Sequence, residues 1–126
     1  MTVSRRFALL VLAAVAIALA AGCTAGPATF GPVEYDQSAL TVTVEAGEPV
    51  VHADLQVAVS ALEGVAQREV FNEARFVDLA PGANRFTYAV DLPDGAYRCY
   101  LHLYDGQERL GAVIRELTIR RGTGRA

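Results

Sequence analysis

The stretch that decides the fold runs from Leu92 to Tyr104 and reads LPDGAYRCYLHLY. It begins with Pro93-Asp94-Gly95, a combination typical of a tight turn, because Pro presets φ and Gly accepts unusual backbone angles. From Tyr97 onward, every second residue is apolar. These residues are Tyr97, Cys99, Leu101 and Leu103. Since side chains alternate between the two faces of a strand, the stretch predicts a turn followed by a half-buried β-strand.

The same alternation continues through most of the chain between residues 38 and 120. Clear segments are 40–44, 51–59 and 86–90, weaker ones are 65–71 and 74–79, and 110–119 forms a closing strand. Turns rich in Gly, Pro, Asn and Asp separate them. Strands spaced by roughly 8–12 residues are typical of an antiparallel sandwich. We therefore expect an all-β, antiparallel sandwich of about seven strands.

The last of these strands has an irregular pattern near Arg115-Glu116. Ala112 and Ile114 are in one phase, and Leu117 and Ile119 are in the other. A β-bulge would bring both pairs to the core. Alternatively, the apolar residues change from one face of a regular strand to the other.

The segment from Leu92 to Cys99 resembles the entry to the sixth strand of immunoglobulin-like and fibronectin-type-III-like folds. In these folds a tyrosine at the position of Tyr97 bonds back to the preceding loop, forming the tyrosine corner. Cys99 stands where antibody-type domains place their second disulfide cysteine. Its partner is expected in the second strand, near residues 55–57, but no cysteine is present there and the chain has no Trp. The resemblance, over residues 38–120, therefore implies a disulfide-free bacterial adhesion or accessory domain.

The N-terminus has the features of an export signal. Arg5 and Arg6 precede the uncharged apolar run Phe7–Ala21, and small residues up to Gly22 stand before Cys23. This end resembles the lipobox of prokaryotic lipoproteins. The resemblance implies cleavage between Gly22 and Cys23, with acylation of the cysteine and attachment to membrane lipid. A plain cleaved signal and a retained anchor are the alternatives, although fifteen apolar residues are short of the ~20 needed to span a bilayer.

These features predict four regions. They are a signal peptide in 1–22 with a helical apolar run, a lipidated cysteine and tether in 23–37, the Ig-like domain in 38–120, and a basic tail in 121–126. We expect the protein to be exported and anchored on the extracytoplasmic side of the cell membrane. The run Ser4–Phe7 also resembles a twin-arginine signal, so both the general-secretion and the twin-arginine routes stay open.

The charge balance of the exported chain is acidic. All 14 acidic residues stay in the exported chain. Of the 11 basic residues, Arg5 and Arg6 leave with the signal, so 9 arginines remain and the net charge is −5. Nucleic-acid binding needs a clustered basic face. We therefore expect no nucleic-acid partner.

One strand face is the strongest candidate for a partner contact. Its outward residues are Arg98, Tyr100, His102 and Tyr104. Tyr and Arg are enriched at binding hot spots, because they supply large contact areas. A sheet face that is simply covered by other parts of the chain is the alternative reading, since Tyr is a good strand former.

Catalytic and metal chemistry have little support. His52 and Asp54 are expected on one outward face, but a metal site needs three or four converging ligands. His102 is expected on a different sheet from His52. Cys99 is expected to point inward as an inert thiol, since burial raises thiol pKa values. We therefore expect no catalytic residue, no metal and no cofactor.

Three functions follow as hypotheses. The first is a lipid-anchored, non-catalytic Ig-like module that binds an envelope protein or polymer. The second is a carrier that holds a small ligand in a cleft at one end of the sandwich. The third is a thiol-dependent redox accessory that acts through Cys99.

Overall fold

A computed structural model describes residues 27–126. The expected signal peptide, its cleavage point and Cys23 lie outside the described residues. Eight strands make up this part of the chain. They are β1 (Ala28–Asp36), β2 (Ala39–Ala46), β3 (Val50–Glu63), β4 (Ala66–Leu79), β5 (Gly82–Ala89), β6 (Gly95–Asp105), β7 (Glu108–Arg120) and β8 (Thr123–Arg125).

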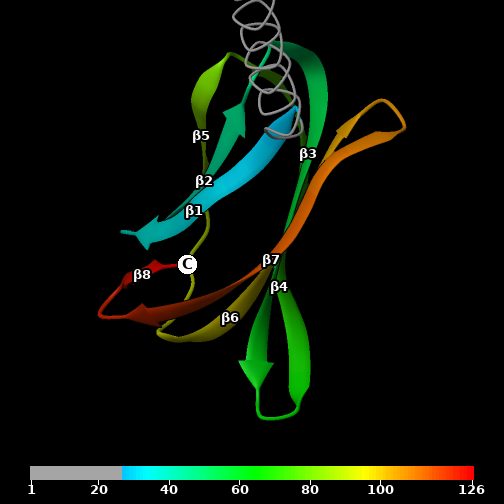
Figure 1. The fold of residues 1–126 in the computed structure, drawn as a ribbon. Coiled ribbons are helices and arrows are strands. Elements are labelled where there is room, and N and C mark those ends of the chain that lie inside the picture. The colour runs from blue at the N-terminus through cyan, green and yellow to red at the C-terminus, as the bar shows by residue number, and fades with distance from the viewer. Residues whose placement is uncertain (1–26) are drawn as a thin grey trace, which may run out of the picture.

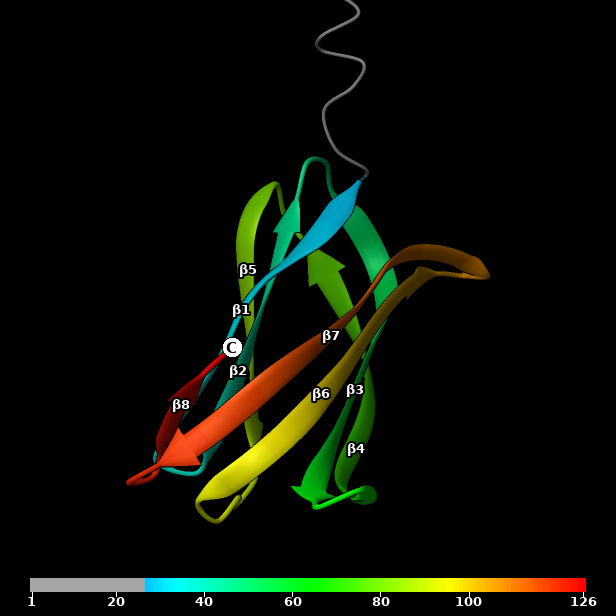
Figure 2. The ribbon, with the colours of Figure 1, turned by 60° about the horizontal axis from the view of Figure 1, so that its bottom comes forward.

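All eight strands belong to one antiparallel sheet with the order β4-β3-β6-β7-β8-β1-β2-β5. The sheet is curled, so that the β4-β3-β6-β7 half faces the β8-β1-β2-β5 half (Figures 1 and 2). The prediction of an all-β antiparallel fold is confirmed. No helix in the described part of the chain is long and apolar enough to cross a membrane.

The core lies between the two halves and follows the alternation seen in the sequence. From β6, Tyr97, Cys99, Leu101 and Leu103 are all buried. The other strands contribute in the same way, with β2 giving Leu40, Val42 and Val44, β3 giving Leu55, Val57 and Val59, and β7 giving Leu117 and Ile119. Burying a branched side chain of this kind contributes roughly 1.5–3 kcal/mol. The alternation therefore indicates which face of each strand is buried in the core and stabilises the fold.

The predicted tether from 23 to 37 instead contains strand β1. Val33 and Tyr35 are buried in the core, and β1 pairs with β2 from Ala28 to Asp36. The Gly31-Pro32 pair, which suggests a linker by composition, coincides with an irregularity in this ladder between Phe30 and Val33. Pro lacks an N–H and is tolerated at such irregularities. Gly31 and Pro32, despite their turn-like composition, therefore belong to a strand.

The predicted basic tail also belongs to the sheet. Strand β8 pairs with β7 and with β1, and so joins the two halves. Val33 and Ala126 exchange two backbone hydrogen bonds of 2.8 and 2.7 Å. At Gly124 a Cβ would lie 2.5 Å from the carbonyl oxygen of Thr118. Only glycine permits this close approach between β8 and β7.

Two further expectations about strands differ from the structure. Residues 65–71 and 74–79 are not two strands, because β4 runs unbroken from Ala66 to Leu79. Strand β7 has no bulge near Arg115-Glu116, since its register with β6 is regular there. The alternative holds instead: Ile114 points outward, while Leu117 and Ile119 point inward.

Because β1 was not predicted from the sequence, β2 and β3 were each numbered one too low. Residues 55–57 lie in the third strand, not the second, and β3 pairs directly with β6, with Val57 opposite Leu101. The strands that carry His52 and His102 are therefore neighbours in one sheet, and the expectation that they lie in different sheets is wrong. The true second strand, β2, contains no cysteine either.

Candidate binding face and end cleft

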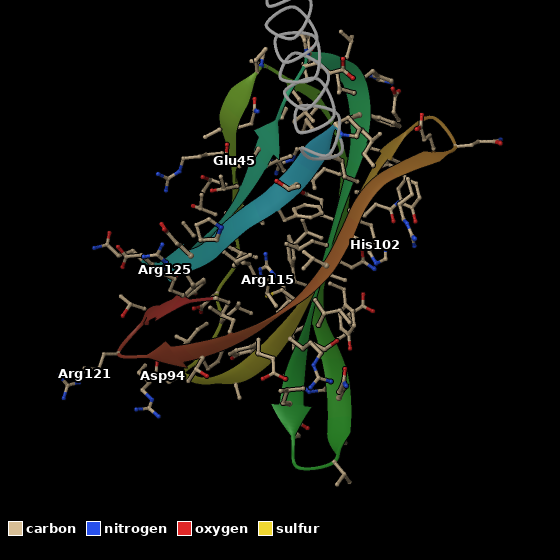
Figure 3. The ribbon with its side chains drawn as sticks, viewed as in Figure 1. Glu45, Asp94, His102, Arg115, Arg121 and Arg125 are labelled. Atoms are coloured by element: carbon tan, nitrogen blue, oxygen red, sulfur yellow. The ribbon has the colours of Figure 1, made fainter. Side chains whose placement is uncertain are left out.

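The outward side chains of β6 form a continuous row, which we call the β6 face: Arg98, Tyr100, His102 and Tyr104. All four are half-buried, and they alternate with the fully buried core residues of the same strand. Figure 3 labels His102 on the outer side of the sheet. Neighbouring strands β3 and β7 flank this row on both sides. The structure thus brings the four predicted residues together on one surface.

Part of the β6 face is held by polar contacts. An Arg98 guanidinium nitrogen lies 3.0 Å from a Glu116 carboxylate oxygen on β7. This bond is the largest cause of a raised Arg98 pKa, so the guanidinium stays charged. Tyr100 Oη donates a 2.8 Å hydrogen bond to Gln67 Oε1 on β4. These partners fix one end of the row, which reduces the entropy that a binding partner would have to remove.

The other end of the row carries rings that have no such partners within the described residues 27–126. The His102 and Tyr104 rings are nearly parallel, with an interplanar angle of 6° and centroids 6.3 Å apart. Ala112 and Ile114 of β7 line a shallow apolar groove together with Tyr100 and His102. Ile114 is 58% exposed. An exposed branched residue beside aromatic rings is typical of a contact surface.

Sequence reasoning missed Ile114 and also Phe76 as parts of this surface. Phe76 of β4 is 62% exposed, and it lies in register with Asp54 of β3, which in turn lies opposite Tyr104. The signal was present in the sequence. Reading 66–79 as one strand places Phe76 in the outward phase, opposite to buried Val77.

His52 and Asp54 are separated by a break in the strand rather than aligned on it. The ladder between β3 and β4 shifts between Val50 and Ala53, and His52 has a positive φ of 60°. The His52 ring stacks on Phe76 with centroids 4.2 Å apart, and its backbone N–H donates to Asp78. Within residues 27–126, no group of three or more His, Cys, Asp or Glu side chains is placed to hold a metal ion.

Cys99 lies in the core between the two halves of the sheet. It is fully buried and, among residues 27–126, forms no disulfide. Desolvation by burial raises the pKa of its thiol to about 11. Thiol reactivity requires an accessible thiolate. These properties are those of a small packed hydrophobe, and they do not favour the redox hypothesis.

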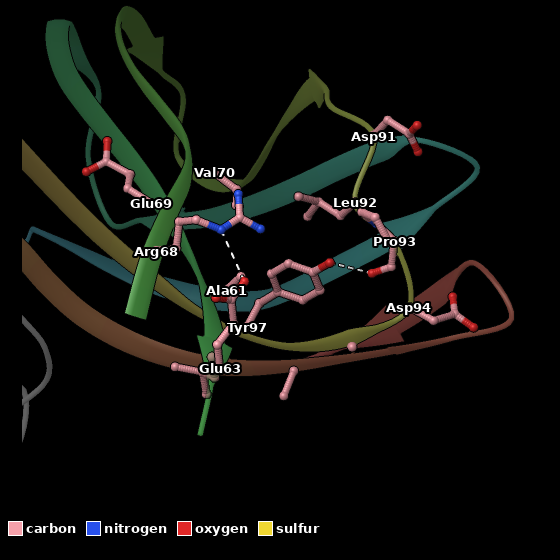
Figure 4. Close-up of a pocket in the computed structure, with 13 residues that line it drawn as sticks. Ala61, Glu63, Arg68, Glu69, Val70, Asp91, Leu92, Pro93, Asp94 and Tyr97 are labelled. Carbon is pink, nitrogen blue, oxygen red and sulfur yellow. Dashed lines mark hydrogen bonds and ion pairs between the residues drawn. The ribbon is translucent and has the colours of Figure 1, made fainter. Parts of the chain in front are cut away.

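A cleft opens at the end of the domain where β3, β4 and the β5–β6 loop meet (Figure 4). Its volume is about 620 Å³. Tyr97 lies at its floor and donates a hydrogen bond to the carbonyl of Pro93 in the loop. This is the contact expected of Tyr97 from the sequence. On the other side, Arg68 Nε lies 3.1 Å from a Glu63 carboxylate oxygen.

The β5–β6 loop beside the cleft is tied down by a second tyrosine. Tyr35 of β1 donates a 3.0 Å hydrogen bond to the Val90 carbonyl and accepts one of 2.8 Å from the Leu92 N–H. Asp94 accepts bonds from the N–H groups of Arg121 and Gly122 in the β7–β8 turn. These bonds, Gly122 first, lower the pKa of Asp94. These hydrogen bonds therefore hold the β5–β6 loop in place on one side of the cleft.

Comparisons with known proteins show no family for this chain. No family model matches the chain, and no curated protein matches it. A solved structure described as the E. coli curli protein CsgC (SeCys) superposes with a TM-score of 0.39 and 13% sequence identity, covering 73% of this chain and 97% of that one. A likeness at this level carries no argument about fold or function.

Proposed function

We propose that the protein is an exported lipoprotein, acylated at Cys23, whose non-catalytic domain binds an envelope protein or polymer through the β6 face. The signal sequence and its small residues before Cys23 support the anchoring. The observation that carries the binding proposal is the exposed surface around β6, where Phe76 and Ile114 add apolar area beside Tyr and Arg side chains. Aromatic and Arg residues are the usual anchors of protein interfaces.

In-cell photocrosslinking tests the binding face. A photoreactive residue replaces Tyr104, whose ring has no polar partner among the described residues, while the lipid anchor stays intact. The matched control replaces Thr87, an exposed residue on the outer side of the other half of the sheet. We expect one discrete crosslinked species from position 104 and none from position 87. Silence at both positions, or equal crosslinking at both, would count against the β6 face.

Intact-mass measurement tests the anchor. The wild-type chain should lose residues 1–22 and gain the mass of a diacylglycerol, with or without a further acyl group. The Cys23→Ser variant should keep its signal peptide or be released without lipid. Because two acyl chains give stable attachment and one gives only marginal binding, carbonate washing should leave the wild type in the membrane.

We also propose that the domain is immunoglobulin-like. The neighbour relations support this: β1, β2 and β5 adjoin one another, as do β3, β6 and β7. These relations match the A-B-E and C-F-G groupings of the immunoglobulin arrangement. The bond from Tyr97 to Pro93 at the start of β6 is a second point of support. An experimental structure in which β8 does not bridge β7 and β1 would show two separate sheets, as in that family.

The end cleft favours the carrier hypothesis as a second candidate. Its volume of about 620 Å³ lies within the range of small-molecule sites. Native mass spectrometry of protein purified from envelopes should then reveal a bound compound. The Ala96→Trp variant, which fills the cleft from its exposed rim, should lose that mass while the β6 face still crosslinks. An empty wild-type protein would remove this candidate.

A further inference from the structure

A β-bulge at the start of β3 turns an apolar side chain out into solvent. The break in the β3–β4 ladder between Val50 and Ala53 contains Val51, which is 75% exposed, and His52, whose φ is positive. Bulges commonly re-aim a side chain, and a positive φ at a non-glycine residue strains the backbone. The next outward residue across the ladder, Phe76, stacks on His52. The backbone distortion thus presents an apolar group instead of hiding it.

This bulge lies at the end of the domain where the chain enters from its N-terminal segment. The Pro27 carbonyl accepts a 3.0 Å hydrogen bond from the N–H of Gly47 in the β2–β3 turn. Cys23 precedes Pro27 by four residues, so at most about 14 Å of chain separates them. Val51 follows Gly47 by four residues and is therefore within a similar reach. We call this the anchor-side end.

The opposite end of the domain is far from the anchor. Strand β3 starts beside the beginning of β1 and runs the length of the molecule to the β3–β4 hairpin (Figure 1). Fourteen residues of strand span roughly 45 Å. Val65 lies in that hairpin and is fully exposed. The chain therefore offers two exposed valines, one at each end.

We propose that Val51, which projects from the bulge beside the His52 ring that stacks on Phe76, is a second membrane contact that rests on the lipid surface. The proposal rests on the proposed acylation of Cys23, which holds the anchor-side end against the bilayer. Because the anchor supplies a high effective concentration, even a weak apolar contact is populated. The contact limits rotation of the domain about its anchor and so gives the β6 face a defined orientation above the membrane.

The charges at this end select the kind of lipid surface. Glu45 and Glu48 are exposed beside the β2–β3 turn, and Asp78 accepts the His52 N–H. The arginines of the β7–β8 turn and of β8 lie away from Glu45, toward the other end of β1 (Figure 3). Anionic lipids repel acidic groups within a Debye length. The contact is therefore made to a zwitterionic surface, by apolar burial.

The test uses the full mature lipoprotein reconstituted in phosphatidylcholine vesicles. Val51→Cys receives an environment-sensitive fluorophore, while Cys99 stays unlabelled because it is buried. Val65→Cys carries the same fluorophore as the matched control. Vesicles containing a lipid with a nitroxide quencher near the headgroup then report contact. We expect quenching of about twofold or more at position 51, little at position 65, and less quenching at position 51 when anionic lipid is added.

Each other result is decisive. Equal quenching at both positions, in protein that floats with the vesicles, overturns the second contact and leaves the anchor in place. Quenching at position 51 that grows with anionic lipid refutes an apolar contact. A mature mass without lipid, together with a chain that does not float, refutes the acylation itself and this contact with it.

Discussion

Replacing Tyr35 with Phe tests how the β5–β6 loop is held to the first strand. The change keeps the buried ring and removes only Oη, which serves two backbone groups. The Leu92 N–H is buried, so leaving it unpaired costs about 1–3 kcal/mol. The Val90 carbonyl is half-buried and regains water, at a cost of about 0.5–1 kcal/mol. We expect Tyr35→Phe to lower the free energy of unfolding by about 2–3 kcal/mol.

Tyr97→Phe is the matched comparison, because it removes one bond from a buried ring of the same kind. Its acceptor is the carbonyl of Pro93, an exposed residue, so the cost is about 0.5–1.5 kcal/mol. Urea unfolding of a chain that begins at residue 24, followed by far-UV circular dichroism, measures both variants. For a domain of this size, the Tyr35 variant should also melt about 10–20 °C lower. A Tyr35→Phe cost equal to or below that of Tyr97→Phe would refute the assigned roles.

Three other sets of substitutions test contacts in the core and at β8. Tyr88→Phe should leave the free energy of unfolding unchanged or raise it by up to about 1 kcal/mol, because the buried Tyr88 hydroxyl has no hydrogen-bond partner among residues 27–126. A loss of more than about 1 kcal/mol in urea unfolding would contradict this. Gly124→Ala should destabilise by at least about 2 kcal/mol through its clash with Thr118, whereas Gly47→Ala should stay near wild type in thermal melts, because no atom of the described residues, apart from Gly47 and its two chain neighbours, lies within 4 Å of the added Cβ. Burial raises the pKa of Cys99 from 9.0 to about 11. The thiol therefore ionises at a lower pH in the unfolded chain than in the folded chain. The stability that depends on the neutral buried thiol, at most about 3 kcal/mol, is complete below pH 9 and is lost as the pH rises through 11. Unfolding curves for Cys99→Ala should therefore show a weaker loss of stability between these pH values.

Period-two alternation was sufficient to predict the strand class and most core residues. It worked best for β6, where Tyr97 to Leu103 are buried at every second position. It worked because the alternation of buried and outward side chains in a strand follows from the order of neighbouring residues in the sequence. The same rule predicted the residues of the β6 face, because they alternate with the buried residues and point to the other side of the strand.

The parts that could not be predicted depend on contacts far apart in the chain. Residues 28–36 contain Gly31 and Pro32, which locally suggest a linker, and only pairing with β2 makes them a strand. Strand β8 has three residues and no pattern of its own, so it exists because β7 and β1 flank it. Phe76 was missed because 65–71 and 74–79 were expected to be two weak strands, whereas they form one continuous strand.

The position of β8 bears on how the molecule assembles. Strands β1 and β8 are hydrogen-bonded partners, although they lie about 90 residues apart in sequence. Forming such distant contacts requires closing a long loop, which slows folding. Until residues 123–125 are free to pair, the two halves of the sheet lack the strand that connects them. A ribosome or translocation channel that still holds residues 123–126 would therefore delay completion of the sheet.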